Sequence, residues 1–285
     1  MDELPFFASE SRLPSPLPPS EVIESSGEVI KESSGRRIIR FNKFYVIKHG
    51  LKVSLTEGQN MLFVRRTTSI PVPEVFALFS KKDDAGRSVK YIIMENIPGC
   101  SLDTAWTRLD STDKVKISNQ IRAHLDILRG IPAPGYFGCI GRKPFEDSIF
   151  WTAPGDNVED GIISGPFDSE SKLNDALVLK YVYNSGLNFK ANYYRRVLPL
   201  VLRNHKAVFT HGDLQRKNVA LAEDGTVVLI DWENAGWFPE YWEYATAMFA
   251  CGAWQDDWHE YVGRILAEYP NEYAWFDMFA RELWS

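Results

Sequence analysis

The residues of this chain that are best suited to chemistry are gathered in one stretch. Carboxylate, carboxamide and imidazole side chains stand there at short intervals among apolar runs; they are His211, Asp213, Asn218, Asp231 and Glu233. Such groups can accept a proton or hold a hard cation through oxygen. The stretch therefore predicts a site for proton transfer or for chemistry assisted by a cation.

A β-hairpin is expected inside this stretch. Asp224-Gly225 stands between two short apolar runs, which is a strong local signal for a hairpin turn. If these are the two loop residues, counting along the strands places Asn218 opposite Asp231. Cross-strand neighbours lie roughly 5 Å apart, so both side chains could hold one Mg²⁺ ion, which commonly takes one or two protein ligands beside substrate phosphates. A longer loop would shift this register.

The order of these residues along the chain resembles that of a known family. A His-x-Asp-x-x-x-x-Asn loop, followed after a hairpin by a further Asp, is the arrangement of phosphoryl-transfer enzymes. The matching segments here are His211-Gly212-Asp213, Asn218 and Ile230-Asp231-Trp232-Glu233. The pattern resembles the aminoglycoside phosphotransferase family, especially its fungal members, and the resemblance runs from about Glu28 to the end of the chain.

This resemblance implies an α+β, bilobal, protein-kinase-like fold, with a small antiparallel-sheet N-terminal lobe containing one helix and a larger, mainly helical C-terminal lobe. It implies that Asp213 orients or deprotonates the attacking hydroxyl, and that Asn218 and Asp231 hold Mg²⁺. For His211 we favour a structural hydrogen bond that fixes the loop, with direct catalysis as the alternative.

Length and composition are compatible with two lobes. The 285 residues, 45% hydrophobic and 25% charged, are enough for one large or two small cores. Residues 1–20 carry five prolines and few bulky side chains, so we expect a flexible tail there. We place a nucleotide-binding lobe at residues 21–96 and a catalytic and acceptor-binding lobe at residues 97–285.

Several classes of protein are disfavoured. The three cysteines are widely separated without a C-x-x-C pair, which argues against a disulfide framework or a zinc site. Neither a signal peptide nor a run of eighteen apolar residues is present, so we expect a cytoplasmic protein without a membrane partner. The net charge of −6 argues against nucleic acid, and no obligatory protein partner is evident.

The N-terminal lobe should contain a five-stranded antiparallel sheet. Its β-rich runs are residues 28–31, 37–41, 44–48, 74–79 and 89–94. Thr56-Glu57-Gly58-Gln59 is typical of a capping box that opens a helix through Val64. By resemblance, Lys48 grips the α- and β-phosphates and Glu57 holds that lysine still. The plainer alternatives are a solvated lysine and a carboxylate favoured by the helix dipole.

Two further nucleotide contacts follow from the resemblance. The turn between the first two strands lacks G-x-G-x-x-G, but the backbone amides of Ser34 and Gly35 could contact phosphate. An ordinary hairpin turn explains these residues equally well. The segment after Met94 should be the hinge between the lobes, where the backbones of Glu95 and Ile97 would meet the base.

The C-terminal lobe indicates a small acceptor. Periodic apolar residues predict helices at residues 112–130, 172–185, 188–204, 239–250, 255–268 and 271–282, and Pro239 begins one of them. Only seven residues separate Asp231 from Pro239. Protein kinases place a long platform for a peptide between the corresponding points. A small-molecule substrate is therefore favoured over a protein.

These observations predict transfer of the γ-phosphoryl group of ATP or GTP, with Mg²⁺, to a hydroxyl of a small molecule. Two alternatives remain open: a nucleotide-binding protein of this fold that does not transfer phosphate, and another nucleotide-dependent transferase. Residues 231–285 carry eleven acidic and two basic residues, so the acceptor could be cationic. Asp256 and Asp257, beside two tryptophans, are the predicted cation contacts, and solvated helix faces are the alternative.

Overall fold

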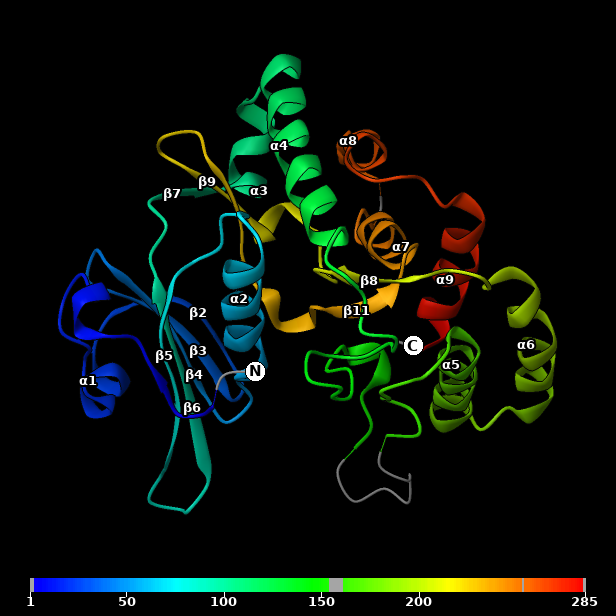
Figure 1. Cartoon of the computed structure of the whole chain (residues 1–285), viewed down its shortest axis with the longest axis horizontal. Helices are drawn as coiled ribbons and strands as arrows, with labels where there is room; N and C mark the ends of the chain where they lie inside the picture. Colours follow the sequence, from blue (N-terminus) through cyan, green and yellow to red (C-terminus); the bar gives the residue numbers. More distant parts are fainter. Residues whose placement is uncertain (1–2, 154–160, 253, 284–285) are drawn as a thin grey trace. The chain divides into compact units, whose positions relative to one another are not determined.

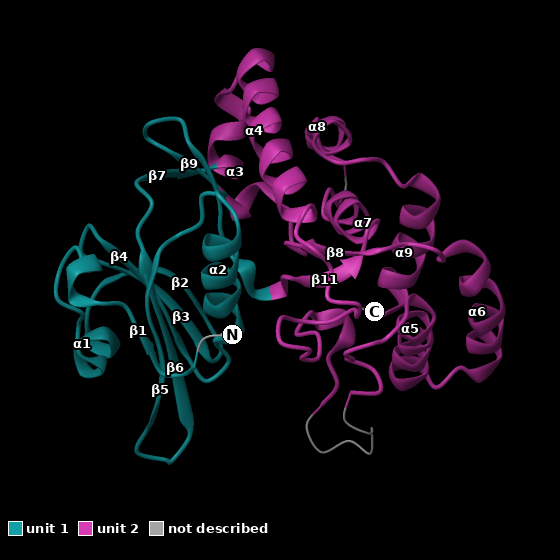
Figure 2. Ribbon diagram, viewed as in Figure 1, with its two compact units in different colours: residues 1–101, 220–233 teal, residues 102–219, 234–285 magenta. Residues whose placement is uncertain are grey.

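The computed structural model describes residues 3–153, 161–252 and 254–283. The chain forms two compact units: unit 1 comprises residues 1–101 and 220–233, and unit 2 comprises residues 102–219 and 234–285 (Figure 2). The sequence placed residues 220–233 in the C-terminal lobe. They join unit 1 because strand β9 (Val219–Ala222) pairs with β7 (Gly99–Ser101), with Gly99 opposite Ala222.

Within the described residues, unit 1 is built on an antiparallel six-stranded sheet in the order β1-β5-β6-β4-β3-β2 (Figure 1). The strands are β1 (Phe6–Phe7), β2 (Glu28–Ser33), β3 (Arg36–Phe41), β4 (Tyr45–Gly50), β5 (Val75–Lys82) and β6 (Ser88–Glu95). Strand alternation separates the two faces, since Tyr45 and Ile47 are buried in one apolar cluster while Lys48 points to the other side.

The N-terminal segment is folded, in contrast to the expected tail. Phe6 and Phe7 form the edge strand β1, paired with Leu78 and Ala77 of β5. The 3-10 helix η1 (Glu10–Arg12) and helix α1 (Ser20–Ser25) follow, and Ile23 is completely buried on the sheet. The apolar residues between the prolines therefore supply the core contacts that composition alone did not reveal. Residues 1 and 2 lie outside the described part of the chain.

Helix α2 (Thr56–Thr67) lies in unit 1 where a helix was predicted, but a capping box does not open it. Leu55 is the N-cap residue and Thr56 is already helical. Ser54 Oγ accepts the Thr56 N–H at 3.1 Å, so the residue that supports the first turn lies two positions earlier than expected.

The hairpin β9–β10 (Val227–Leu229) has a longer turn than the sequence suggested. Ala222 N–H donates to Thr226 O and Gly225 N–H donates to Ala222 O, both at 2.9 Å. Gly225 has φ +83°, which is the left-handed residue of a three-residue loop. The register is shifted by one residue, so the pairing of Asn218 opposite Asp231 was wrong.

Unit 2 is mainly helical and carries a two-stranded sheet of β8 (Ala207–Thr210) and β11 (Gly236–Pro239). Its helices are α3 (Leu102–Ala105), α4 (Ser111–Arg129), α5 (Glu170–Ser185), α6 (Asn188–Val201), α7 (Trp242–Phe249), α8 (Trp258–Ile265) and α9 (Pro270–Leu283). Pro239 ends a strand and does not begin a helix, because it pairs with Ala207. An aromatic core with Phe145, Phe238 and Trp242 stacked on one another joins α7 to the other helices.

A half-buried histidine ties the entry of β8 to two helices. His205 Nδ1 lies 2.5 Å from Glu170 Oε1 of α5, and Nε2 lies 3.5 Å from Glu272 Oε1 of α9. Burial lowers the pKa of His205, but Glu170, Glu272 and the more distant Glu240 outweigh it, so the pKa is raised. The charged imidazolium therefore stabilises unit 2.

We expect the free energy of unfolding to fall as pH rises through the raised pKa of His205. A raised folded-state pKa stabilises in full below the unfolded pKa of about 6.5, and this contribution is lost above the folded pKa. Urea unfolding between about pH 6 and pH 9 measures the slope. His205→Gln should flatten it, whereas His259→Gln, at a histidine without a carboxylate partner among the described residues, should not. Equal slopes in both variants would show that His205 is not the group responsible.

Candidate active site

A buried lysine in unit 1 is held between two carboxylates. Lys48 Nζ, on β4, lies 2.6 Å from Glu57 Oε1 of α2 and 2.7 Å from Asp231 Oδ1. The structure thus joins the pair of Lys48 and Glu57, which the resemblance implied, to Asp231, which the resemblance implied as a metal ligand. Lys48 faces α2 because its neighbour Ile47 turns into the opposite, apolar face of the sheet.

The electrostatics of this triad favour a charged lysine. Burial lowers the pKa of Lys48, but the charges of Glu57 and Asp231 outweigh it and raise the pKa. Burial raises the pKa of Glu57 to about 7, against the opposing effect of Lys48. Asp231 is the more exposed of the two carboxylates, with 28% of its side chain accessible. It is therefore the partner better able to leave Lys48 for another ligand.

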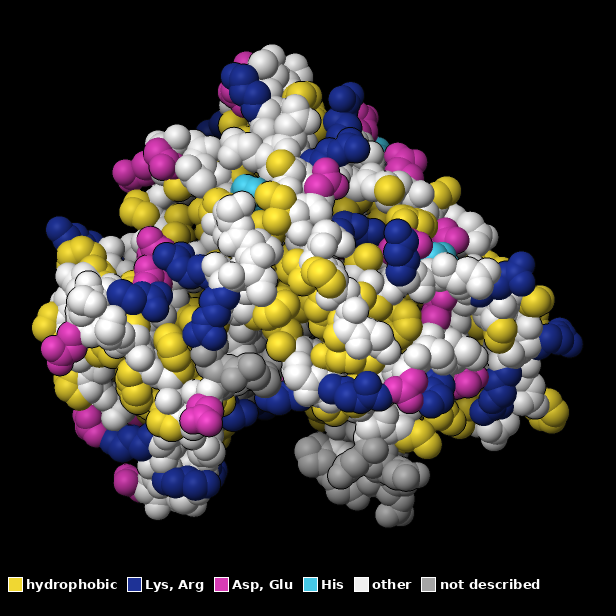
Figure 3. Space-filling view, viewed as in Figure 1, with side chains coloured by type: hydrophobic (Ala, Val, Ile, Leu, Met, Phe, Trp, Pro, Cys, Tyr) yellow, Lys and Arg dark blue, Asp and Glu magenta, His cyan; other side chains and the backbone are white. Residues whose placement is uncertain are grey.

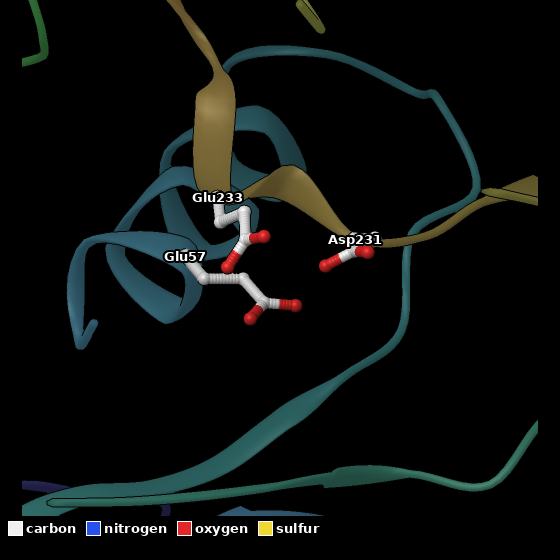
Figure 4. Close-up of side chains that lie close together, drawn as sticks. All are labelled: Glu57, Asp231 and Glu233. Carbon is white, nitrogen blue, oxygen red and sulfur yellow. The ribbon is translucent and has the colours of Figure 1, made fainter. Parts of the chain in front are cut away.

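A second ion pair lies beside the triad. Arg36 of β3 contacts Glu233 with an N–O distance of 2.7 Å. Oxygens of Glu57, Asp231 and Glu233 come within 4.8 Å of one another, and their carboxylates point into one space (Figure 4). Oxygen ligands of this kind fit a hard cation such as Mg²⁺. Glu57 offsets the charge of Lys48, and Glu233 offsets that of Arg36. The negative charge of Asp231 is then in excess, so Asp231 is the best metal ligand of the three.

Helix α2 also positions the segment around Asp231. Asn60 Nδ2 donates to Trp232 O at 2.8 Å, and the Trp232 indole donates to Leu229 O at 2.9 Å. Asp231 itself has φ +65°, a left-handed conformation that is uncommon for a residue with a side chain. The completely buried Asn60 thus helps to hold a strained turn from which Asp231 reaches Lys48.

Gly58 allows α2 to approach the sheet closely. A Cβ atom at this position would lie 2.1 Å from Leu78 Cδ2 on β5. Gly58→Ala should therefore destabilise the fold by about 1–3 kcal/mol through overpacking, measured by urea unfolding. Adding Leu78→Ala removes the obstacle, so the double variant should lose less than the sum of the two single changes. Strict additivity would contradict the close contact.

The predicted phosphate turn and hinge are both well ordered by backbone hydrogen bonds. Gly35, in the turn after Ser34, has φ +82° and accepts from the Lys52 N–H at 2.8 Å. Glu95 ends β6 and donates its N–H to Glu74 O at 2.8 Å. The N–H of Glu95 is thus already engaged within unit 1. Nucleotide contacts at Ser34, Gly35, Glu95 and Ile97 stay predictions.

In unit 2, a buried glutamate organises the loop after β8. Glu243 of α7 accepts the backbone N–H of His211 at 2.7 Å and that of Gly212 at 3.2 Å. Burial raises the pKa of Glu243, and His211 and the two N–H groups oppose this. His211 is also completely buried, and its Nδ1 accepts the Asp213 N–H at 3.3 Å. These contacts agree with the structural interpretation of His211.

Asp213 and Asn218 are in direct contact. Asn218 Nδ2 donates to Asp213 O at 2.9 Å and to Asp213 Oδ2 at 2.7 Å. Gln215 Nε2 donates to the other carboxylate oxygen, and Lys217 Nζ lies 3.8 Å from Oδ2. Because the Asn218 amide nitrogen is directed at Asp213, its amide oxygen is turned away and is available as a ligand. The carboxylate is thus fixed in one orientation.

A pocket of about 310 Å³ opens beside Asp213 within unit 2. Its lining combines carboxylate, hydroxyl and amide groups with one aromatic ring; the lining residues are Asp147, Ser148, Gly212, Asp213, Gln215, Asn234, Thr246, Phe249 and Ala250. A cavity of this size and mixed polarity fits a small polar molecule. The loop carboxylate therefore faces a space in which an acceptor could bind.

The predicted cation contacts already have cations of the chain as partners. Asp257 accepts from Lys114 Nζ and from Trp106 Nε1, each at 2.7 Å, and Asp256 accepts from Arg216 Nη2 at 2.6 Å. Lys114 Nζ also lies 4.7 Å from the ring centre of Trp106. A carboxylate beside an indole ring is suited to bind an ammonium group, and the ammonium group of Lys114 occupies this position. An acceptor amine would have to displace this lysine, so that contact stays a prediction.

Sequence reasoning missed three residues that position the site. Arg36 contacts Glu233, which lies 197 positions later, and Asn60 contacts Trp232, 172 positions later. Glu243 contacts the loop at His211, 32 positions earlier. Nothing near them in the sequence indicates these partners. Glu243 carried one usable signal, because a glutamate among the aromatics of a buried helix start needs hydrogen-bond donors.

The chain matches known proteins in part of its sequence and in its fold. Residues 170–279 match the model of the phosphotransferase enzyme family (APH). A Subtelomeric hrmA-associated cluster protein of Aspergillus fumigatus is 30% identical over 142 residues, which are 50% of this chain and 26% of that protein. A second protein of this name, from another strain, is 32% identical over 31% of this chain and 17% of its own length. The matches thus span about a quarter or less of the curated relatives.

Solved structures match over most of the chain. The streptomycin-ATP-APH(2")-IIa ternary complex has a TM-score of 0.53 and 12% identity, covering 94% of this chain and 87% of that one. A thermostable APH(4)-Ia mutant with ADP and hygromycin B has a TM-score of 0.57 and 16% identity, covering 92% and 82%. The GDP complex of aminoglycoside 2'-phosphotransferase-IIIa has a TM-score of 0.56 and 14% identity, covering 90% and 83%.

At these identities the solved structures establish the fold, and the family model matches the part of the chain that includes Asp213, Asn218 and Asp231. The expected α+β kinase-like fold is confirmed. The resemblance stated from the sequence is confirmed with it: this chain has the fold of the aminoglycoside phosphotransferases, and its residues 170–279 match the model of the phosphotransferase enzyme family.

Proposed function

We propose that this protein transfers the γ-phosphoryl group of ATP or GTP to a hydroxyl of a small molecule. The observation that carries the proposal is Lys48 held at 2.6 Å from Glu57 and 2.7 Å from Asp231. A buried ammonium with one deeply buried partner and one more exposed partner is suited to neutralise phosphate charge when the exposed partner turns to a metal ion. Nucleotides in the solved structures of this fold support a nucleotide donor.

Each unit contributes part of the proposed chemistry. In unit 1, Lys48 binds the phosphates, Glu57 keeps the lysine in place, and Asp231 is the main metal ligand. In unit 2, Asn218 offers its amide oxygen to the metal and Asp213 takes the proton of the acceptor hydroxyl. Bound Mg²⁺ would supply neutralisation of the phosphate charge. Catalysis by the chain then consists mostly of positioning and charge stabilisation.

The acceptor is expected to be a small polar molecule rather than a protein. The pocket beside Asp213 has about 310 Å³ and a mixed polar lining, which suits a hydroxyl-bearing metabolite. The test is a panel of alcohols, sugars, amino alcohols and natural products incubated with Mg-ATP or Mg-GTP. Release of the nucleoside diphosphate together with an acceptor heavier by one phosphoryl group supports the proposal. Another transferred group would favour the alternative transferase.

Binding of the donor is tested separately by thermal unfolding. At about 100 times its Kd, Mg-nucleotide should stabilise the protein by about 2.7 kcal/mol. Asp231→Asn should reduce the shift because a metal ligand loses its charge, whereas Glu223→Gln on the same hairpin should leave it unchanged. The absence of a shift with every Mg-nucleotide would rule out the phosphotransferase. A normal shift without any product would favour a non-catalytic nucleotide-binding protein.

A further inference from the structure

The outer face of helix α6 carries an exposed apolar stripe. The inner face of this helix is buried through Ala191, Tyr194 and Leu198. On the other side, the exposed fraction is 95% for Phe189 and 61% for Leu200. At about 100° per residue these two side chains lie on the same side of the helix, directed away from the core. Apolar side chains with such large exposed fractions, gathered on one face, indicate a surface that binds a partner.

Tyr193 extends the stripe, and Leu187 precedes it at the helix start. Their exposed fractions are 43% and 59%. Tyr193 lies one turn from Phe189 on the same side of the helix. Arg196 stands over the Tyr193 ring, with its guanidinium carbon 5.7 Å from the ring centre. The stripe is therefore bordered directly by positive charge.

The segment around α6 is basic although the whole chain is acidic. Residues 186–206 carry five Lys and Arg and no Asp or Glu, in a chain of net charge −6. Lys190 is paired with Glu282. In the described part of the chain, Arg195, Arg196 and Arg203 form no ion pair with a carboxylate. In Figure 3, Lys or Arg and hydrophobic side chains occur together over α6, at the right edge of the view.

This combination argues against a second copy of the chain as the partner. A symmetric pairing through α6 would bring the unpaired arginines of both copies together, and like charges at an interface repel. The partner should instead be anionic and able to receive projecting apolar side chains. A lipid surface with anionic headgroups has both properties, because apolar side chains enter its interfacial region without needing a matching pocket.

We propose that the outer face of α6 docks this protein on an anionic membrane surface. Phe189, Tyr193 and Leu200 enter the interfacial region, and Arg195 and Arg196 contact lipid phosphates. In the described residues no helix is long and apolar enough to cross a membrane, and this docking requires none. The expectation of no membrane partner rested on the absence of an apolar run long enough to span a membrane. Neither that criterion nor the net charge of the whole chain detects a basic face on a single helix. The proposal is independent of the proposed phosphotransfer.

Flotation of the full chain with lipid vesicles tests the proposal. Binding is expected to vesicles of phosphatidylcholine with phosphatidylserine and to be much weaker with phosphatidylcholine alone. Added salt should release the protein, because the Debye length falls from about 10 Å at 0.1 M to about 3 Å at 1 M. Equal binding to both kinds of vesicle, or no binding to either, would overturn the proposal.

Two sets of variants locate the contact. Arg195→Gln with Arg196→Gln should weaken binding about thirtyfold, since each basic residue near an anionic surface contributes about a fivefold factor. Phe189→Ser should weaken it by about tenfold or more through lost apolar burial. Lys116→Gln with Arg122→Gln is the matched control: it removes the same charge from exposed sites on α4, each near a carboxylate of that helix.

The two sets also separate a lipid surface from an acidic protein. The control variant should bind vesicles like the original chain, and all variants should keep the same urea unfolding midpoint because the changed side chains are exposed. If the control weakens binding as much as the α6 variants, the attraction is a diffuse charge effect and the proposal fails. If an acidic polypeptide is bound through α6 while vesicles are not, the partner is a protein and the proposal fails as well.

Discussion

Changing Asp213 to asparagine is expected to lower turnover by at least about 10²-fold, the lower end of the range for removing a general base. The change keeps the size of the side chain but removes its charge, so it can no longer take the proton of an acceptor hydroxyl. Asn218 and Gln215 fix the orientation of this carboxylate, and Lys217 lies 3.8 Å away. The Kd for Mg-nucleotide should not change, because Asp213 is assigned neither to the phosphates nor to the metal ion.

Asp224→Asn provides the matched control for this prediction. Asp224 lies on the β9–β10 turn, and its Oδ1 accepts the Thr226 N–H at 2.9 Å, a bond that asparagine can keep. Turnover of the control should equal that of the original chain. Turnover and Kd are measured by diphosphate release and by calorimetry. Unchanged turnover in Asp213→Asn would remove this residue from the mechanism, and a large rise in Kd would assign it to donor binding instead.

The fold was predictable where local pattern and family resemblance agree. Strands β2 to β6 and helices α2 and α4 to α9 lie close to the predicted ranges, because their apolar residues alternate or recur with the right period. The N-terminal segment was mispredicted because its prolines dominate the composition, whereas its pairing with Leu78 depends on a strand more than seventy positions away. Edge-strand pairing is a tertiary effect that no local pattern contains.

In the candidate site, too, contacts between residues that are close in sequence were predicted, and contacts with distant residues were not. Lys48 and Glu57 are nine positions apart on adjacent elements, and the resemblance named both. The turn at Asp224-Gly225 was recognised, but this dipeptide is compatible with loops of two or three residues, and one residue of difference shifts every cross-strand pair. Asp256 and Asp257 contact cations of the chain itself, and their contact with an acceptor stays a prediction. The sequence could not tell that Lys114, about 140 positions away, is the partner of Asp257.

Lys48→Met is expected to weaken Mg-nucleotide binding by roughly 10- to 100-fold, because a charged hydrogen bond to phosphate contributes about 1.5–3 kcal/mol. The same change should lower the free energy of unfolding by about 3–5 kcal/mol, since it leaves the buried Glu57 without its cation. Both effects can be measured on one protein, by calorimetry with Mg-ATP and by urea unfolding. By themselves they do not separate binding from stability.

The double variant Lys48→Met with Glu57→Leu separates them. It replaces a buried ion pair by apolar side chains of similar volume, which is often neutral or stabilising. Asp231 keeps solvent access with 28% of its side chain exposed, so it tolerates the loss of Lys48. We therefore expect stability to return close to that of the original chain while nucleotide affinity stays low. Recovery of affinity together with stability would mean that Lys48 only supports the fold, and the assignment of this lysine to the phosphates would then be wrong.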